Sequence, residues 1–201
     1  MEQEKRIRKF DKQAAKYAKK RNSQAANKWR RKLFNKASGH TLEVAIGAGM
    51  NFPYYSKSIK LTAVDFSPAM LKEARKGAAE HKIETDFILS AVEDLDFPSN
   101  SFDTIVSAGT LCTYEEPVRV LNLFNRWCKP DGQILLLEHG VTRFAPLAGL
   151  QKVLDPIAIK MIGCHQNRDI EKIVRRSDVR IEKIERAILG YLYLIWAKSQ
   201  K

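Results

Sequence analysis

One stretch decides the fold: Leu42-Glu43-Val44-Ala45-Ile46-Gly47-Ala48-Gly49-Met50-Asn51. Its apolar first half is typical of a buried strand, and its small residues let a ligand approach the backbone closely. A second apolar strand, 61–65, ends in Asp65, sixteen residues beyond Gly49. A carboxylate at the tip of a second strand is placed to accept hydrogen bonds from both hydroxyls of a ribose. The two strands therefore predict a site for an adenosine-containing ligand.

The glycine loop departs from two other nucleotide-binding patterns. A dinucleotide fingerprint needs a third small residue, where this chain has Phe52. A Walker loop needs Gly-Lys followed by Ser or Thr, which the sequence lacks. The loop therefore suits an adenosyl ligand without a pyrophosphate. Taken alone, it is equally consistent with an ordinary strand-to-helix turn.

Strands and helices alternate from this stretch towards the C-terminus. Strands are expected near 41–46, 61–65, 86–89, 103–107 and 133–138. Ser67 and Pro68 predict a helix from 68 to about 80, and Lys129-Pro130-Asp131-Gly132 has the composition of a turn. The runs 180–189 and 191–198, joined at Gly190, predict a hairpin. The expected fold is α/β: a Rossmann-like, doubly wound, seven-stranded, mostly parallel sheet with an antiparallel C-terminal hairpin and N-terminal helices.

Basic charge is concentrated near the N-terminus. Residues 1–36 hold 14 of the 35 Lys/Arg and 3 of the 23 Asp/Glu in a chain of net charge +12. Apolar residues at spacings of three and four predict two short amphipathic helices there, ahead of a core domain at 37–201. Such a segment suits an anionic membrane surface or a nucleic acid. A merely solvated helix face is the alternative.

Composition excludes several other classes of protein. A chain of 201 residues is long enough for one domain with a full core. No apolar run approaches the roughly 20 residues of a membrane span, and the start MEQEKRIRK lacks the apolar part of a secretory signal. A cytoplasmic location is therefore expected. Cys112, Cys128 and Cys164 are odd in number and widely spaced, which favours reduced thiols over a disulfide framework or a zinc site. No metal is expected.

Further motifs follow the glycine loop in a fixed order. They occupy 43–51, 64–71, 92–97, 101–103 with Leu111, and 129–132. In this order they resemble the successive motifs of class I S-adenosylmethionine-dependent methyltransferases, over about residues 40–140. The resemblance implies S-adenosyl-L-methionine as the cofactor and transfer of its methyl group to an acceptor.

The same resemblance assigns the positions that bind the cofactor. The loop around Gly47 would wrap the methionine part, Asp65 would hold the ribose and Phe66 would pack on the adenine. For Asp65, a structural cap of the helix that starts at Ser67 is the alternative. Residues 91–93 would line the adenine, and 107–108 would face the methionine amino group. The assigned positions are Glu43, Ala45, Gly47, Gly49, Asn51, Asp65, Phe66, Met70, Ala91, Val92, Glu93, Ser107 and Ala108.

Two positions depart from the family pattern. Ala45 stands where the family usually has Gly, and its methyl group is expected to fit if the backbone stays at negative φ. Ala91 stands where the family usually has an Asp that receives the adenine amino group. A backbone carbonyl or Ser90 could replace that carboxylate. A non-catalytic module with a degenerate cofactor site is therefore one alternative hypothesis.

Segments outside the core indicate the acceptor side. The run 10–17 is similar to the entry helix of quinone-biosynthesis methyltransferases, which implies that 1–36 forms a lid. Loops 109–116 and 139–167 follow strands four and five and are the natural walls of the acceptor site. An apolar helical segment in the second loop would cover a pocket or pack on the sheet.

Candidate residues on this side include one catalytic base. His139 follows the fifth strand and could serve as the base. Tyr17 would contact the cofactor or the substrate, with core packing as the alternative. The substrate or lid candidates are Tyr17, Cys112, Tyr114 and His165.

The acceptor itself stays open at this point. The C-terminal half resembles microsomal thiol S-methyltransferases, and the whole pattern is similar to bacterial phosphatidylethanolamine N-methyltransferases, whose basic N-terminal helix docks on anionic lipid. A small lipophilic acceptor is predicted: a thiol, an amine, a quinol or a phospholipid headgroup. Peripheral association with an anionic membrane through 1–36 is part of this hypothesis. An RNA methyltransferase is the alternative, although Ser-Ala-Gly-Thr at 107–110 replaces the Asn/Asp-Pro-Pro-Tyr motif of amine sites.

Overall fold

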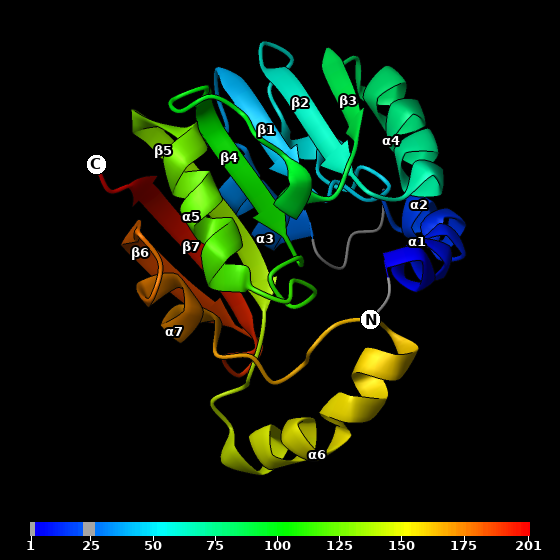
Figure 1. Ribbon diagram of the computed structural model, residues 1–201, viewed down its shortest axis with the longest axis vertical. Helices are drawn as coiled ribbons and strands as arrows, with labels where there is room; N and C mark the ends of the chain where they lie inside the picture. Colours follow the sequence, from blue (N-terminus) through cyan, green and yellow to red (C-terminus); the bar gives the residue numbers. More distant parts are fainter. Residues whose placement is uncertain (1–2, 22–26) are drawn as a thin grey trace.

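The computed structural model describes residues 3–21 and 27–201. Seven strands form one sheet in the order β3-β2-β1-β4-β5-β7-β6 (Figure 1). Strands β1 to β5 pair in parallel, whereas β7 is antiparallel to both β5 and β6. The strands are β1 (His40–Val44), β2 (Lys60–Asp65), β3 (Thr85–Leu89), β4 (Phe102–Ala108), β5 (Cys128–His139), β6 (Val179–Ala187) and β7 (Leu192–Ser199). The predicted Rossmann-like sheet and its C-terminal hairpin are confirmed.

Helices cover both faces of the sheet. They are α1 (Gln3–Asp11), α2 (Ala14–Lys20), α3 (Asn27–Phe34), α4 (Pro68–His81), α5 (Pro117–Trp127), α6 (Ala145–Met161) and α7 (Ile170–Arg175), with 3-10 turns η2 (Phe52–Tyr54) and η3 (Val92–Asp94). Apolar residues of α3 and α4 pack on one face, and those of α5 and α7 pack on the other. The strand order reverses between β1 and β4, so the carboxyl ends of these strands form the crevice in which such folds bind ligands.

Two details differ from the predictions made from the sequence. Three helices, not two, occupy the N-terminal segment, because the first amphipathic run is interrupted between α1 and α2; residues 22–26 lie outside the described part. The predicted turn at 129–132 is instead part of β5. Cys128 pairs with Phe102 of β4, and the next pair is Gln133 with Thr104, so five residues of β5 lie opposite two of β4. The Pro and Gly therefore form an irregularity within the strand rather than its start.

Helix α6 stands away from the sheet (Figure 1). Many of its large apolar side chains are exposed, including Leu150, Val153 and Ile157. Of the two alternatives for this segment, packing on the sheet is therefore ruled out. Within residues 3–21 and 27–201, no helix combines the length and apolar character that a membrane crossing requires.

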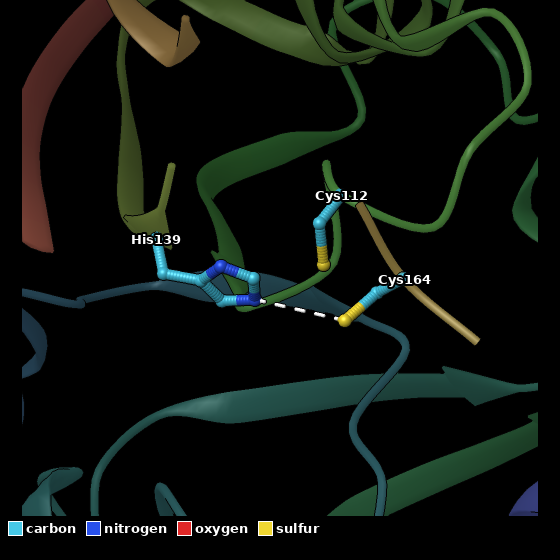
Figure 2. A group of neighbouring side chains, drawn as sticks. All are labelled: Cys112, His139 and Cys164. Atoms are coloured by element: carbon cyan, nitrogen blue, oxygen red, sulfur yellow. Dashed lines mark hydrogen bonds between the residues drawn. The ribbon is translucent and has the colours of Figure 1, made fainter. Parts of the chain in front are cut away.

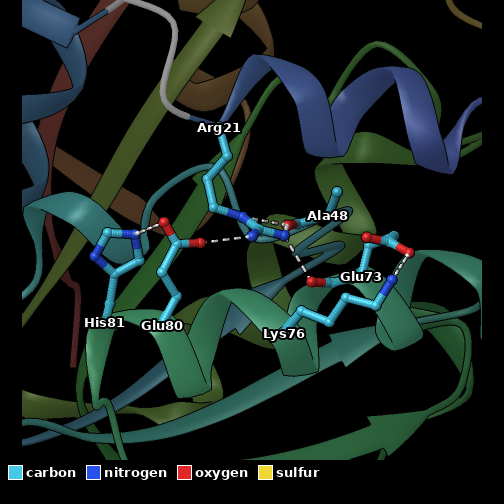
Figure 3. Close-up of polar contacts among 6 residues, drawn as sticks. All are labelled: Arg21, Ala48, Glu73, Lys76, Glu80 and His81. Atoms are coloured by element: carbon cyan, nitrogen blue, oxygen red, sulfur yellow. Dashed lines mark hydrogen bonds and ion pairs between the residues drawn. The ribbon is translucent and has the colours of Figure 1, made fainter.

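Arg21 attaches the N-terminal helices to the core (Figure 3). Its side chain is 7% exposed, and its Nε and Nη2 donate to the Ala48 carbonyl at 3.1 and 2.8 Å. Nη2 also donates to the Glu73 carbonyl at 2.6 Å, and Nη1 pairs with the Glu80 carboxylate at 3.2 Å. The side chain needs the space left at Gly77, where a Cβ would lie 2.8 Å from the guanidinium. One arginine thus links α2 to the glycine loop and to α4.

We expect Arg21→Met to lower the free energy of unfolding by about 1.5 to 3 kcal/mol, because hydrogen bonds to a charged group are lost and buried carbonyls lose their donor. Amide hydrogen exchange in α1 and α2 should accelerate in the same variant. Urea denaturation and hydrogen exchange measure the two effects. Lys20→Met is the matched control, since Lys20 is exposed on the same helix. Equal stability of the two variants would contradict this role of Arg21.

Candidate active site

A pocket opens at the carboxyl ends of β1, β2 and β4. Its walls come from the glycine loop, the tip of β2, the loop after β4 and the N-terminal helices. The predicted residues that line it are Tyr17, Glu43, Ala45, Gly47, Asn51, Asp65, Phe66, Met70 and Ala108. Those that the sequence interpretation missed are Phe10, Arg30, Ile46, Ala48, Met50, Gly109, Thr110 and Thr113. The pocket therefore lies at the position predicted for an adenosyl ligand.

Asp65 connects the tips of the two strands that define the pocket. Its Oδ2 accepts a hydrogen bond from the Gly47 N–H at 2.8 Å, and its Oδ1 accepts one from the Ser67 N–H at 2.9 Å. Burial raises the pKa of Asp65 to about 6. Each oxygen keeps a second lone pair, so the carboxylate can also accept hydrogen bonds from ribose hydroxyls. Its place in the pocket suits the predicted contact with the ribose.

Glu43 is a buried acid that lines the pocket on the side predicted for the methionine part of the cofactor. Its carboxylate accepts hydrogen bonds from Asn51 Nδ2 and from the Tyr55 hydroxyl, each at 2.7 Å. Burial raises the pKa of Glu43 to about 7. The Asn51 amide oxygen in turn accepts a hydrogen bond from Arg30 Nη1. Asn51 therefore connects the buried acid to an arginine of the N-terminal segment.

Arg30 is the charged wall residue that the sequence interpretation missed. It extends from α3 into the pocket, and burial lowers the pKa of its guanidinium. Its Nε is buried without a hydrogen-bond partner among the described residues. A guanidinium with an unsatisfied donor suits a carboxylate, which the methionine part of S-adenosylmethionine carries. The residues present therefore fit this cofactor.

Ala45 does not meet the condition under which its methyl group was expected to fit without strain. Its φ is +46° rather than negative. The chain turns sharply where β1 ends at Val44, and Gly47 and Gly49 in the same loop also have positive φ. This explains why glycine suits the position, since an L-residue in the left-handed region is strained.

A second hollow adjoins the pocket on the predicted adenine side. Phe66 lines both hollows, and Ala91 and Glu93 line only the second. The Phe66 ring is covered by α1, because Phe10 meets it edge-on at 5.4 Å between centroids and the Arg6 guanidinium lies 5.3 Å from its centroid. Helix α1 thus closes the pocket over the ring predicted to contact the adenine.

Three further predicted cofactor residues line neither of these two hollows. Gly49 belongs to the glycine loop and lies against the Phe52 ring, from which a Cβ would be only 2.3 Å away. Val92 belongs to the hydrophobic core. The buried Ser107 hydroxyl donates to Glu138 at 2.8 Å and hydrogen-bonds with Thr110 at 2.6 Å. These residues shape the loops that carry the pocket.

The acceptor-side candidates gather in a neighbouring hollow. Cys112, Tyr114 and His165 line it, together with Cys164. His139 does not line the cofactor pocket; its Nε2 lies 3.9 Å from Cys164 Sγ. Its Nδ1 is buried without a hydrogen-bond partner among the described residues, so no carboxylate orients the ring as a base. His165 Nδ1 is paired with the Asp155 carboxylate at 2.8 Å.

The two thiols in this hollow are neighbours, with sulfur atoms within 4.8 Å of one another. The nearby Cys112 thiol and, to a smaller extent, His139 and Gln166 lower the pKa of Cys164, while burial opposes this shift. The nearby Cys164 thiol and burial raise the pKa of Cys112. The widely spaced cysteines of the sequence are therefore neighbours in the fold.

The sequence and the fold of the chain are both similar to those of known proteins. A family described as a methyltransferase domain matches residues 42–136. Phosphatidylethanolamine N-methyltransferase of Cereibacter sphaeroides is 33% identical over 153 residues, which are 75% of this chain and 74% of that protein. Thiol S-methyltransferase TMT1B of Rattus norvegicus is 33% identical over 150 residues, but the chain covers only 61% of its length. The crystal structure of a SAM-dependent methyltransferase from Aquifex aeolicus has a TM-score of 0.64 at 17% identity and covers 90% of this chain and 96% of its own.

The chain belongs to the class I S-adenosylmethionine-dependent methyltransferases. The fold, the cofactor and the type of reaction predicted from the motifs are confirmed. The two relatives act on different acceptors by their names, a lipid amine and a thiol.

Ala45→Gly should relieve the left-handed strain at the end of β1. We expect the free energy of unfolding to rise by up to about 1 kcal/mol, because relief of about 1 to 2 kcal/mol of strain is partly offset by the entropy of glycine in the unfolded chain. Ala63→Gly in β2 is the control: Ala63 is buried and is not among the residues of positive φ, so this change should be destabilising. Thermal denaturation of both variants measures the contrast, and a loss of stability in Ala45→Gly would count against the strain.

Asp65→Ala should weaken the binding of S-adenosylhomocysteine at least roughly tenfold, since each hydrogen bond to a charged group contributes about 1.5 to 3 kcal/mol. In the unmodified protein, affinity should decrease as the pH falls through about 6, where the buried Asp65 becomes protonated and loses acceptor capacity. Calorimetric titration at pH 5 and pH 7.5 measures both effects. Asp86→Ala, on the exposed side of β3, is the control. Unchanged affinity in Asp65→Ala would show that the ribose binds elsewhere.

Proposed function

We propose that this methyltransferase works on the surface of an anionic membrane and transfers methyl groups to the amine of a phospholipid headgroup. One observation carries the proposal: an exposed apolar surface adjoins a basic one, and the basic one adjoins the cofactor pocket. Of the two relatives described above, the chain covers more of the phosphatidylethanolamine N-methyltransferase, 74% of its length, than of the thiol S-methyltransferase, 61%. This coverage also supports a lipid amine as the acceptor.

The apolar surface lies on α6 and the turn between β6 and β7. Apart from Leu89, every large apolar side chain that is exposed in the described part of the chain belongs to this region. We call these residues the apolar face: Phe144, Leu147, Leu150, Val153, Leu154, Ile157, Met161, Ile162, Ile188 and Leu189. Val153 and Met161 are 73% and 72% exposed. So large an apolar patch is typical of a surface that meets a membrane or a partner.

The basic surface is continuous with the apolar face. Helices α1 and α2 line a hollow together with Met161 and Ile162 at the end of α6. The basic residues of this hollow are Lys5, Arg8, Lys9, Lys12, Lys16 and Lys20. Lys9 Nζ donates to the Lys160 carbonyl at 2.6 Å, which joins α1 to α6. Because a lysine or arginine near an anionic surface contributes about 1 kcal/mol, this charge favours a membrane as the occupant of the adjoining face.

Tyr17 connects the basic hollow to the cofactor pocket. It lines both, so an acceptor that enters from the side of α1 and α6 passes this residue on its way to the cofactor. Phe10 and Tyr17 also pack with Ala48 and Met70 of the core. In this proposal residues 1–36 are the lid of the site, and the lid carries the charges that face the lipid.

The lining of the pocket suits an amine acceptor. When bound, S-adenosylmethionine supplies an electrophilic methyl group on a sulfonium. No histidine, lysine or cysteine of the described chain lines the pocket, so the walls offer orientation rather than a strong base. A neutral amine attacks directly and releases its proton afterwards, whereas a thiol must lose its proton first. Thr110, Thr113 and Tyr17 provide hydroxyl groups to orient the amine.

The double variant Val153→Glu/Ile157→Glu should lose binding to vesicles that contain phosphatidylglycerol and phosphatidylethanolamine. Each apolar side chain kept out of the lipid forfeits about 1.5 to 3 kcal/mol, so the bound fraction should fall more than roughly tenfold. Methyl transfer to the lipid should fall in parallel, with unchanged affinity for S-adenosylhomocysteine. Vesicle sedimentation, radiolabelled methyl transfer and calorimetry give these three values. Leu89→Glu, at the exposed apolar residue on β3, is the control.

An acceptor panel of phosphatidylethanolamine vesicles, aliphatic thiols, quinols and a structured RNA tests the chemistry. Transfer to the lipid amine alone supports the proposal. Transfer to thiols without transfer to lipid would replace the amine by a thiol acceptor. Salt-dependent binding and methylation of RNA would overturn the membrane proposal, and no transfer to any acceptor would favour a non-catalytic module.

A further inference from the structure

Three potential metal ligands from distant parts of the sequence meet beside the acceptor side (Figure 2). Cys112 belongs to the loop after β4, His139 ends β5, and Cys164 follows α6. Their ligand atoms all lie within 4.8 Å of one another, and His139 Nε2 is 3.9 Å from Cys164 Sγ. Both cysteines are buried and unoxidised. Reduced thiols and an imidazole at such separations are the donor set that zinc prefers.

Backbone and carboxylate hydrogen bonds hold the two cysteines face to face. The His165 N–H donates to the Cys112 carbonyl at 3.0 Å, which ties the segment after α6 to the loop after β4. The buried Asp155 carboxylate accepts from the Gln166 N–H at 2.6 Å and pairs with His165 Nδ1 at 2.8 Å. The two residues that follow Cys164 are therefore each held by one oxygen of the Asp155 carboxylate.

A second set of contacts positions the ligand atoms themselves. Gln166 Nε2 donates to Cys164 Sγ at 3.0 Å, and the Tyr191 hydroxyl donates to Gln166 Oε1 at 2.9 Å. The Tyr191 ring is stacked on His139 at 5.4 Å between centroids and 19° between planes. One tyrosine thus supports both the imidazole and the amide that contacts the sulfur. Such outer contacts orient ligands in metal sites.

We propose that Cys112, His139 and Cys164 bind a zinc ion. Zn–S bonds of about 2.3 Å in a tetrahedral site place two sulfur atoms about 3.8 Å apart, so the ligand atoms need to move closer by no more than about 1 Å. Three protein ligands leave the fourth position to a water molecule. The two cysteines line a hollow with Thr113, which also lines the cofactor pocket. The ion would fix the loop after β4, the end of β5 and the segment after α6 as one wall of the acceptor site.

Cobalt substitution in the full chain tests the proposal. After removal of bound metal by a chelator, titration with Co²⁺ should produce thiolate-to-cobalt charge-transfer absorption and the intense visible bands of a tetrahedral site, at one ion per chain. Zn²⁺ should displace the cobalt and bleach these bands. Cys112→Ser and Cys164→Ser each remove a ligand and should weaken the binding of Co²⁺ more than about 100-fold. Gln166→Ala removes only an outer contact to a ligand and should weaken it about 10- to 100-fold, as is typical of such contacts.

Cys128→Ser is the matched control, because Cys128 is also buried but is not part of the cluster. Calorimetric binding of S-adenosylhomocysteine, measured on every variant, shows that each one is folded. This readout and the cobalt spectrum need no methyl acceptor, so failure of the zinc site is distinguishable from failure of the proposed lipid activity. Absence of the charge-transfer band in the unmodified protein, or its persistence in Cys112→Ser and Cys164→Ser, would overturn the proposal. A Cys112–Cys164 disulfide that forms in the presence of zinc would overturn it as well.

Discussion

The Asp65 carboxylate holds the site together. By accepting the Gly47 and Ser67 amides it fixes the loop after β1 against the start of α4. Ser67 Oγ then accepts from the Met70 N–H at 3.1 Å, so the first turn of α4 is capped by the residue that Asp65 orients. Asp11 of α1 joins the same network, since its carboxylate accepts from the Ala69 N–H at 3.2 Å and from Ser67 Oγ. The loop, the helix and the N-terminal segment therefore share one acidic anchor.

This anchor requires a particular path of the backbone. The Gly47 amide reaches Asp65 only because the chain reverses directly after β1, and the reversal forces Ala45 into the left-handed region. The strain at Ala45 is thus a consequence of presenting loop amides to the ligand. Glycine adopts the left-handed conformation without this strain, whereas the alanine at position 45 is strained and adds a methyl group to the wall of the pocket.

Local patterns were sufficient to predict the sheet, the capped helix α4, the hairpin and the position of Asp65, whereas Phe66 was assigned through the family resemblance. Each depends on residues close together in the chain: apolar strands, the Ser67-Pro68 start, and Gly190 between two β-rich runs. Arg21 and Arg30 could not be found in this way, because their partners lie tens of residues away in sequence. The cluster of Cys112, His139 and Cys164 was missed for the same reason: the spacing rules for metal sites detect ligands on one turn, not on three segments that the sheet brings together.

The basic N-terminal segment shows why composition alone left its role open. Arg21 is buried on backbone carbonyls, and Arg30 is half-buried in the wall of the pocket, where it hydrogen-bonds to Asn51, so these two charges serve the fold and the cofactor pocket. Most lysines of α1 and α2 instead line the hollow beside α6, namely Lys5, Lys9, Lys16 and Lys20. A solvated helix face would explain those lysines but not their placement next to the only large group of exposed apolar side chains in the described chain. A membrane offers both an anionic surface and an apolar interior, whereas a nucleic acid offers only charge, so the pair of neighbouring surfaces supports the proposal of a membrane.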